Sequence, residues 1–405
     1  MINVVVFGKN YGGVFYHRLF TPHRKLAELC GEDYTIKFFD KFPSPKDYIS
    51  FFRGVDIVVF NRLISSNMGV IRIIKFIGTK VVVDIDDYWR LDSSHLLYKQ
   101  SLSEKWEEQV KNTISLADAV ITTTDAFADE IRREGLNENV FVIPNSLDKS
   151  DGQFTPHPTE SNKVRFGVLC GSSHLEDMRI LNGLVERLPK DVLDECEFHL
   201  CGFDTESYQI IKKPNGKDVV IKDNPKDIIW TKYEKILTND YRICSARYIK
   251  YLNKFTKEPC EFDTSEEKYF RKWSKKVDEY GCMYNDFDVL LVPLRDTKFN
   301  RMKSQLKTVE AGFMGKAIIA SNVGPYTIDL VSIFDGHEKG NSILITDNGN
   351  IMEWVNAVSH FVKNKADISL SANNLKELVM EKYDLDVVTD IRDKLYKKLY
   401  EEANA

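Results

Sequence analysis

The sequence lacks the features that mark several large classes of protein. No apolar run approaches the roughly 18 residues that a membrane-spanning helix requires, and the amino terminus does not have the pattern of a signal peptide. A net charge of −5 gives no general attraction to nucleic acid. No fixed-period repeat or low-complexity tract is visible. We therefore expect a globular cytoplasmic protein whose closest association with a membrane is peripheral contact.

Cysteine does not occur in the patterns that build structural sites. The seven cysteines form no Cys-x-x-Cys pair, and no group of histidine and cysteine has the spacing of a zinc site. An odd, irregular set in a chain without an export signal is typical of reduced thiols. We therefore expect neither a disulfide framework nor a structural zinc ion.

The sequence does contain enough material for two α/β domains. Its 405 residues are 43% hydrophobic and 29% charged, which fits a folded globular protein. Short apolar runs alternate with helical patterns, as expected for strands that are buried on both faces of a parallel sheet. In the first half these runs cover residues 2–8, 34–40, 56–62, 80–87, 118–124 and 139–144. This alternation predicts a doubly wound parallel sheet.

A polar segment with two prolines, residues 149–162, predicts a linker. The alternation then starts again, with predicted strands at 163–171, 197–202, 288–294, 316–321 and 342–346. Polar and aromatic sequence interrupts it at about 204–264, which we interpret as an insertion. The expected organisation is a first domain at 1–148, a second at 163–380, and a C-terminal helix at 381–405 that can pack back on the first domain.

Residues 299–313 carry the most informative pattern. A helix over this stretch has an apolar stripe and, beside it, a polar stripe of Asn300, Lys303, Lys307 and Glu310. Lys303 and Glu310 are two turns apart, so they point almost the same way. After an apolar strand, such a helix begins at the carboxyl edge of a parallel sheet, where anionic ligands bind. The lysine suits a phosphate and the glutamate suits sugar hydroxyls, although an ordinary amphipathic helix with solvated charges shows the same pattern.

Two glycine-containing loops follow the first strand of each half, at 8–13 and 171–177. Glycine lets backbone N–H groups approach an anion, and serine can cap the following helix. Neither loop matches the G-x-G-x-x-G or Walker A pattern, so dinucleotide and NTP sites of those types are disfavoured. Turns explain most single loops of this kind, but two in equivalent places indicate a bound ligand. The ligand-binding candidates in these loops are Gly12, Gly13, Gly171, Ser172, Ser173 and His174.

Three carboxylates lie close together where a predicted strand ends, in Asp84-Ile-Asp-Asp87. Alternation puts Asp84 and Asp86 on one face, with Asp87 at the carboxyl edge of the sheet. Their repulsion has to be offset by a cation, an arginine or a network of sugar hydroxyls. Arg62, at the tip of the preceding strand, is a natural partner. Helix caps and a structural Asp–Arg pair would also explain the pattern.

Two segments carry a resemblance to a known family. Residues 143–148, Ile-Pro-Asn-Ser-Leu-Asp, and residues 310–325, which begin Glu-Ala-Gly-Phe-Met-Gly, both match its signatures. The chain resembles GT-B glycosyltransferases of the broad retaining group often called family 4. Tyr16-His-Arg18 and Asp84-Ile-Asp-Asp87 are similar to a subgroup of bacterial and phage surface-sugar enzymes. The resemblance covers most of the chain apart from the insertion.

Two positions depart from the pattern of that family. Met302 stands in place of its first glutamate, and Lys316 in place of its proline. The sugar-hydroxyl role of the first glutamate therefore does not transfer to this chain. The resemblance implies that Glu310 binds both ribose hydroxyls of the donor and that Lys303 stabilises the departing diphosphate. It also implies two Rossmann-like domains that face a cleft.

The same resemblance implies a UDP- or GDP-sugar as co-substrate and no required metal or other cofactor. The acceptor stays open between a glycan, a lipid-linked sugar, a protein side chain and a modified nucleobase. Asp87 and Asp86 would orient acceptor or sugar hydroxyls. The acceptor side would further include Arg18, Arg62 and Asp84, and the donor side Asn300 and Ser304.

Three other functions compete with this interpretation. A GT-A transferase would use Asp84 and Asp86 to hold Mn²⁺ or Mg²⁺, but it leaves the second α/β half and the Glu310 segment unexplained. A nucleotide-sugar epimerase would use the same two-domain scaffold and turn over its donor without an acceptor. A non-catalytic sugar-nucleotide-binding protein would account for the missing glutamate and proline.

Overall fold

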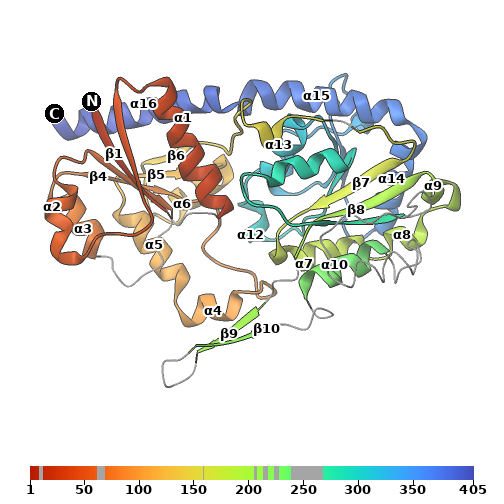
Figure 1. Ribbon diagram of the computed structural model, residues 1–405, viewed down its shortest axis with the longest axis horizontal. Helices are drawn as coiled ribbons and strands as arrows, with labels where there is room; N and C mark the ends of the chain where they lie inside the picture. Colours follow the sequence, from red (N-terminus) through yellow and green to blue (C-terminus); the bar gives the residue numbers. More distant parts are fainter. Residues whose placement is uncertain are drawn as a thin grey trace. The chain divides into compact units, whose positions relative to one another are not determined.

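The computed structural model of the chain describes residues 1–8, 12–61, 69–157, 159–204, 208–212, 218–222, 228–238 and 268–405. The chain divides into two compact units, each with its own parallel sheet (Figure 1). The first unit consists of Met1–Phe154, Asp296–Phe313 and Leu378–Ala405, and the second of Thr155–Arg295 and Met314–Glu377. The segment Asp296–Phe313 therefore groups with the first unit, although it lies in the range expected for the second domain.

The first unit is built on six parallel strands in the order β2-β1-β3-β4-β5-β6. Their bounds are β1 (Ile2–Phe7), β2 (Tyr34–Phe39), β3 (Ile57–Asn61), β4 (Lys80–Asp84), β5 (Ala119–Thr122) and β6 (Val140–Val142). Side chains alternate along each strand, so Val5 and Phe7 enter one hydrophobic cluster and Val4 and Val6 enter another. Both faces of the sheet are apolar, and both have to be covered by helices.

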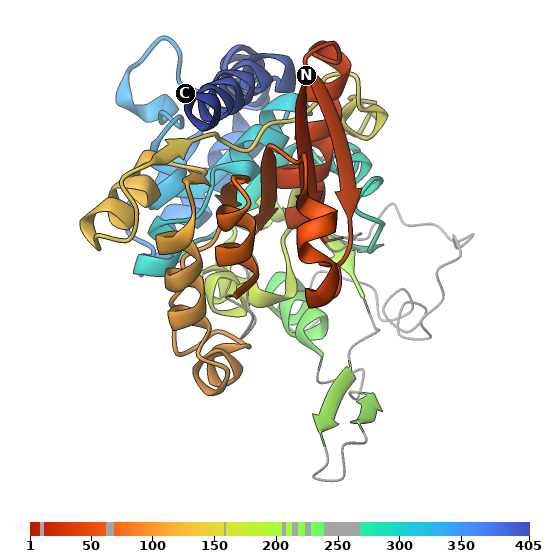
Figure 2. The same cartoon turned by 90° about the vertical axis from the view of Figure 1, so that its left-hand side faces the viewer.

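Different helices cover the two faces. One cluster includes side chains of α2 (Tyr48–Phe52), α3 (Gly69–Phe76), α5 (Trp106–Leu116) and α6 (Asp125–Arg133). The other includes side chains of α1 (Thr21–Leu29) and α16 (Leu385–Asn404). Helix α16 lies alongside α1, as Figures 1 and 2 show from two directions. The C-terminal helix is thus part of the first unit.

The second unit repeats this architecture with six parallel strands in the order β11-β8-β7-β12-β13-β14. The strands are β7 (Val164–Leu169), β8 (Cys196–Phe203), β11 (Tyr269–Trp273), β12 (Val289–Val292), β13 (Ala317–Ser321) and β14 (Ile343–Ile345). The helices are α7 (Leu175–Met178), α8 (Leu184–Arg187), α9 (Lys190–Asp194), α10 (Ile229–Thr238), α14 (Ile351–Lys363) and the first part of α15 (Lys365–Tyr383), which from Leu378 onward groups with the first unit. The two sheets confirm the prediction of two doubly wound domains. In the described part of the chain, no helix combines the length and apolar composition needed to cross a bilayer.

The segment interpreted as an insertion is only partly an excursion from this fold. It begins with an antiparallel hairpin of β9 (Tyr208–Lys212) and β10 (Asp218–Lys222). Helix α10 follows, and its Tyr233 and Leu237 are buried in the core of the second unit. This helix connects β8 to the edge strand β11, which the sequence analysis did not predict. Residues 239–264 of the segment lie outside the described residues.

The single helix predicted over 299–313 is wrong, because the chain forms two helices there. Helix α12 (Lys298–Arg301) ends before Met302, and α13 (Leu306–Phe313) begins four residues later. Between them, Ser304 accepts a hydrogen bond from Asn145 Nδ2 at 2.7 Å and Gln305 donates to Tyr383 Oη at 2.9 Å. Polar side chains that find partners away from the helix compete with helix formation. Lys303 and Glu310 therefore do not share one face of one helix.

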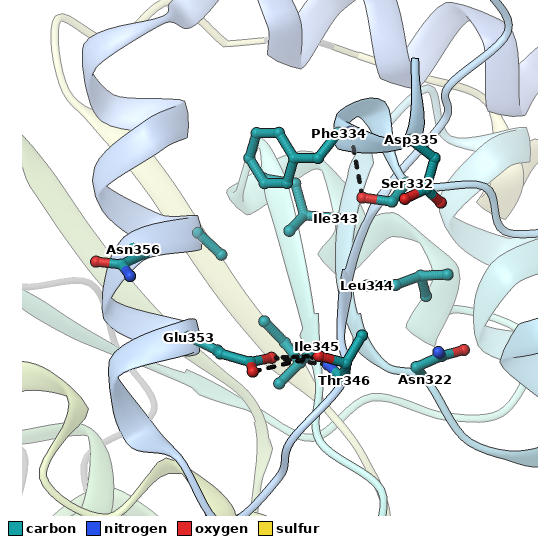
Figure 3. A pocket seen from close by; sticks show the side chains of 11 residues that line it. Asn322, Ser332, Phe334, Asp335, Ile343, Leu344, Ile345, Thr346, Glu353 and Asn356 are labelled. Atoms are coloured by element: carbon teal, nitrogen blue, oxygen red, sulfur yellow. Dashed lines mark hydrogen bonds between the residues drawn. The ribbon is translucent and has the colours of Figure 1, made fainter. Parts of the chain in front are cut away.

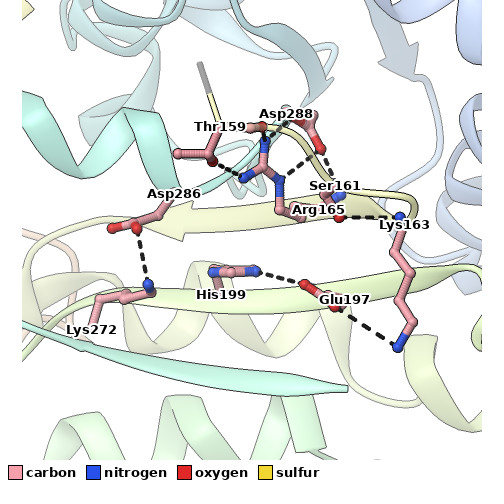
Figure 4. Close-up of polar contacts among 9 residues, drawn as sticks. All are labelled: Thr159, Ser161, Lys163, Arg165, Glu197, His199, Lys272, Asp286 and Asp288. Atoms are coloured by element: carbon pink, nitrogen blue, oxygen red, sulfur yellow. Dashed lines mark hydrogen bonds and ion pairs between the residues drawn. The ribbon is translucent and has the colours of Figure 1, made fainter. Parts of the chain in front are cut away.

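Ion pairs connect the starts of strands in the second unit (Figure 4). Arg165, on β7, donates to the two carboxylate oxygens of Asp288 at 3.0 and 2.6 Å, just before β12 begins. Beside it, Glu197 of β8 lies 3.8 Å from Lys163 Nζ and 3.4 Å from His199 Nε2. These pairs lie at the opposite end of the strands from the edge where parallel sheets bind ligands. We assign them to stability.

Candidate functional site

The first candidate residues lie on a π-helix, Phe15–Phe20, that follows β1. The glycine at position 8 is needed for this connection, because a Cβ there would overlap the ring of Phe15. A π-helix is rare and is often found at functional sites. It turns Arg18 into the interior, where Nε and Nη2 lie 2.9 and 3.0 Å from the carboxylate of Asp84.

Arg18 and Asp84 are therefore a buried structural pair. Arg18 Nη1 also donates to the carbonyl of Ile143 at 2.8 Å and to Asn145 Oδ1 at 3.2 Å. Both side chains are enclosed, so this geometry does not favour the expected contact of Arg18 and Asp84 with an acceptor. Both oxygens of Asp84 also accept bonds from Arg18, which opposes the metal-binding GT-A alternative. Arg62, the partner expected from the sequence, lies outside the described residues.

The same network reaches the segment that carries Lys303. Asn145 contacts Arg18 through its carbonyl oxygen and Ser304 through its amide nitrogen. Its neighbour Lys303 is half-buried, with Nζ 4.9 Å from the ring centroid of Phe299. Asn300 is buried within α12. Asn300, Lys303 and Ser304 are thus close in sequence and held by the first unit.

Glu310 is the centre of a second group of charges. It is fully buried in α13, and its carboxylate lies 2.7 Å from Lys307 Nζ one turn earlier. Both charges act on His17 of the π-helix, because Glu310 raises the pKa of this histidine and Lys307 lowers it. Burial is the larger influence and lowers the pKa of His17 to about 4. His17 is therefore neutral near neutral pH and able to donate or accept a hydrogen bond.

Tyr16 lies next to His17 and belongs to a separate polar group. Its hydroxyl donates to Asp151 at 2.7 Å and accepts a hydrogen bond from Gln153 at 2.9 Å. Burial, together with Asp151, raises the pKa of Tyr16 to about 12. The segment expected as a linker therefore contributes Asp151 and Gln153 to the polar surroundings of the π-helix.

Asp86 and Asp87 follow β4 at its carboxyl end, where the topology predicted them. Both are half-buried. Asn61, at the end of β3, donates to Asp86 Oδ1 at 3.2 Å and to the carbonyl of Asp84 at 2.9 Å. This asparagine fixes the turn after β4, and the two carboxylates remain partly accessible to a ligand.

The candidate glycine and serine residues of the two loops are exposed. Gly12 and Gly13 are exposed, and a Cβ on either would meet no atom within 4 Å. In the second unit Gly171, Ser172 and Ser173 are exposed as well. Neither serine caps a helix, because the cap of the turn is Gly171 and no side-chain bond is made there. The loop is held from behind, where Tyr233 Oη donates to the carbonyl of Gly171 at 2.9 Å.

His174 closes this loop against the following helix. Its Nδ1 lies 2.8 Å from Asp177 Oδ2, and Asp177 Oδ1 accepts a hydrogen bond from the backbone N–H of Arg295 at 2.9 Å. Arg295 Nε lies 3.6 Å from the same oxygen. The second unit thus brings Gly171 to His174 together with an arginine that the sequence analysis did not select.

The structure groups the remaining candidates by unit. The first unit holds Gly12, Gly13, Arg18, Asp84, Asp86, Asp87, Asn300, Lys303, Ser304 and Glu310, and the second holds Gly171, Ser172, Ser173 and His174. Sequence reasoning missed His17, Lys307 and Asn145 as site residues. Lys307 had a readable signal, because it stands three residues before Glu310 on one helix. Asn145 lies in the segment 143–148 that carries the family resemblance, but that segment does not reveal its contacts to Arg18 and Ser304, which are 127 and 159 positions away in sequence.

Comparisons by sequence find no relative, since no protein-family model and no curated protein matches the chain. By structure, sucrose-phosphate synthase from Thermosynechococcus elongatus matches 99% of this chain and 100% of its own, with a TM-score of 0.61 and 13% identity. Anabaena HepE in complex with UDP matches 98% and 100%, with a TM-score of 0.59 and 15% identity. A UDP-forming trehalose-phosphate synthase from Burkholderia vietnamiensis matches 98% of both chains, with a TM-score of 0.57 and 11% identity.

Because the sequence identities are only 11–15%, these structural matches establish the fold alone. They extend over both units of this chain and over nearly the whole of each matched protein. The chain therefore has the GT-B fold that the sequence resemblance implied.

Proposed function

We propose that this protein is a glycosyltransferase that moves a sugar from a nucleotide-sugar donor to an acceptor. The observation that carries the proposal is the match of both units to solved structures that include complexes with UDP and with UDP-glucose. A fold alone does not determine function, so the proposal also requires a site with the right chemistry. We extend it to the retaining, family 4-like group on the signature at residues 310–325.

On the donor side we assign Glu310 to the ribose and Lys303 to the diphosphate. Glu310 is as enclosed as Asp84, so its assignment to the ribose rests on the signature at residues 310–325 and requires that the donor reach a carboxylate already paired with Lys307. A carboxylate can accept several hydrogen bonds at once, so this ion pair does not by itself oppose the assignment.

Lys303 supplies a positive charge that offsets the negative charge developing on the departing diphosphate. The exposed backbone N–H groups of Gly12 and Gly13, in the same unit, can bind this anion, and those of Gly171 to Ser173 are a separate candidate for phosphate contact on the second unit. A UDP-sugar is the first donor to test, because the matched complexes contain UDP.

On the acceptor side we assign Asp86 and Asp87. Both are half-buried at the carboxyl edge of the first sheet, where they can orient an acceptor hydroxyl. Transfer with retention and without a metal ion belongs to the proposal. Following the anomeric configuration of the product by NMR tests the first point, and activity in the presence of EDTA tests the second.

A thermal-shift screen against UDP, GDP, ADP and CMP, with and without their sugars, tests the proposal. A ligand that binds only the folded protein stabilises it by about 2.7 kcal/mol at a concentration of 100 times Kd. Only the correct nucleotide is expected to raise Tm, and the matching sugar nucleotide is then offered a panel of acceptors. Donor turnover without any acceptor would favour an epimerase, and the absence of turnover and of slow hydrolysis would favour a binding protein.

Glu310→Gln tests the ribose assignment in the same assay. We expect donor affinity to fall by about 1–3 kcal/mol, the cost of losing hydrogen bonds from a buried carboxylate. Glu130→Gln is the matched control, because Glu130 is also a buried glutamate of the first unit that is paired with a lysine, Lys298. Equal donor binding by wild type and Glu310→Gln would contradict the assignment.

A further inference from the structure

A cavity of about 420 Å³ lies along β14, the edge strand of the second sheet. None of the candidate residues described above lines it. Its wall consists of β14, of Glu353, Asn356 and Ala357 from α14, and of Ser332, Phe334 and Asp335 from the segment before the strand. Figure 3 shows Phe334 and Ile343 on one side of the strand and Leu344 with Asn322 on the other. The cavity therefore extends around an open sheet edge.

The edge of β14 is closed at both ends. The carbonyl of Ser342 accepts a hydrogen bond from Ile333 N–H at 2.9 Å, and Thr346 N–H donates to Glu353 Oε2 at 2.8 Å. Between them, Ile345 turns its carbonyl toward β13, where it accepts from Asn322 N–H at 2.8 Å. Alternation then points the N–H and C=O of Leu344 into the cavity, and no described residue bonds them on that side. One residue is too short an edge for a peptide that adds as a strand.

The rim of the cavity carries an exposed aromatic ring that is held in place. Phe334 is 59% exposed and also lines a neighbouring cavity of about 180 Å³. The ring of His360 packs edge-on against it, with centroids 4.9 Å apart. His360 is fixed in turn, because its Nε2 lies 2.7 Å from Asp367 Oδ2. Phe334 is thus an apolar platform with a supported orientation.

Polar groups line the same cavity. Asn322, Asp335 and Asn356 are exposed around the cavity and offer both hydrogen-bond donors and acceptors. A ligand that fits has one apolar face for the ring and several hydroxyls around its edge. A sugar ring has this chemistry, since its axial C–H bonds form an apolar face and its hydroxyls point outward.

We propose that the cavity beside β14 is a carbohydrate-binding site, in which a sugar ring of a glycan stacks on Phe334. Hydroxyls of this ring and of the neighbouring sugar units of the glycan bond to the exposed amide and carboxylate side chains along the cavity and to the backbone of Leu344. This site is formed by residues other than those of the proposed transferase site. The proposal therefore does not require that this protein transfers sugar. The site gives the second unit a means to hold a glycan through its own edge strand.

Methyl NMR of the full chain with labelled Ile and Leu tests this site directly, because Ile343, Leu344 and Ile345 line it. The probes are maltotriose, cellotriose and N-acetylchitotriose, with affinities in the range of about 1 mM expected for one or two sugar rings. We expect at least one of them to shift the methyl signals of these three residues. Phe334→Ala should weaken that response about tenfold, and Asn356→Ala should weaken it as well.

The matched control is Phe76→Ala, which removes a ring that is 87% exposed on α3 of the first unit. It should leave the response at β14 unchanged. Three outcomes would overturn the proposal: no shift at these methyl groups with any of the three sugars, an equal shift in Phe334→Ala, or a shift caused only by an extended peptide of alternating Val and Lys. Binding seen only at other methyl groups would belong to a different site and would also count against it.

Discussion

Breaking the Arg18–Asp84 pair tests whether these residues support the first unit or contact an acceptor. Both side chains are almost completely enclosed, and the guanidinium makes four hydrogen bonds to Asp84, Ile143 and Asn145. Arg18→Leu leaves the carboxylate of Asp84 buried without its cation. Removing one partner of a buried pair costs about 3–5 kcal/mol. That is a large part of the 5–15 kcal/mol that a typical domain has.

Hydrogen exchange followed by mass spectrometry resolves the effect by unit. Arg18→Leu should speed exchange in β1 and β4 by a factor of about 100 or more, while β7 and β12 of the second unit exchange as in the wild type. The double variant Arg18→Leu/Asp84→Leu should recover part of the protection, because it leaves no uncompensated buried charge. The two residues are 66 positions apart in sequence and join the π-helix to β4, so the loss of the pair acts on both elements.

An exposed pair of the same geometry is the control. Arg90 also binds both carboxylate oxygens of its partner, Glu107, but these side chains are 57% and 34% exposed. Arg90→Leu should therefore cost less than about 1 kcal/mol. If Arg18→Leu proved as mild as Arg90→Leu and yet abolished sugar transfer, the buried structural role would be refuted and the acceptor role supported.

Three further predictions concern buried ionisable groups. Burial lowers the pKa of His17 from 6.5 to about 4, so between these two pH values the unfolded chain binds more protons than the folded chain. The free energy of unfolding therefore decreases as the pH is lowered from 6.5 to 4. In urea unfolding, His17→Gln should remove about 3 kcal/mol of that decrease. Burial also lowers the pKa of Lys316 to about 8, so Lys316→Met should raise Tm near neutral pH, and a lower Tm would show that its attraction to Asp288 outweighs desolvation. Glu234→Gln should destabilise the second unit by about 3–5 kcal/mol, seen as faster exchange in β8 and β11 with β1 unchanged, because it leaves Arg271 buried without its anion.

The two sheets could be predicted because their signal is local. Each buried strand is a short apolar run, and the predicted ranges overlap the observed strands at β1 to β6 and at five strands of the second sheet. The missed strand, β11, has a charged residue in its middle, Arg271. This arginine is acceptable inside the unit because Glu234 of α10 binds it at 2.6 Å. A strand that depends on a distant counter-charge does not show the apolar pattern that sequence reasoning relies on.

The break in the predicted helix at 299–313 has a similar cause. The helical spacing of apolar residues continues through the whole stretch, but this spacing reflects only residues that are close together along the chain. Ser304 and Gln305 make their hydrogen bonds to Asn145 and Tyr383, which are 159 and 78 residues away. Contacts of this kind decide where the helix stops, and a single sequence does not contain them.

This break changes how the site has to work. On one continuous helix, Lys303 and Glu310 would be fixed relative to each other by the helix itself. Here Lys303 stands in the connection before α13, beside the Ser304 that Asn145 holds, whereas Glu310 is held within α13 by Lys307. Two separate sets of contacts therefore position the proposed phosphate-binding and ribose-binding groups. A substitution at Asn145 should displace the ammonium group of Lys303 and leave Glu310 in place. A substitution at Lys307 should displace the carboxylate of Glu310 and leave Lys303 in place.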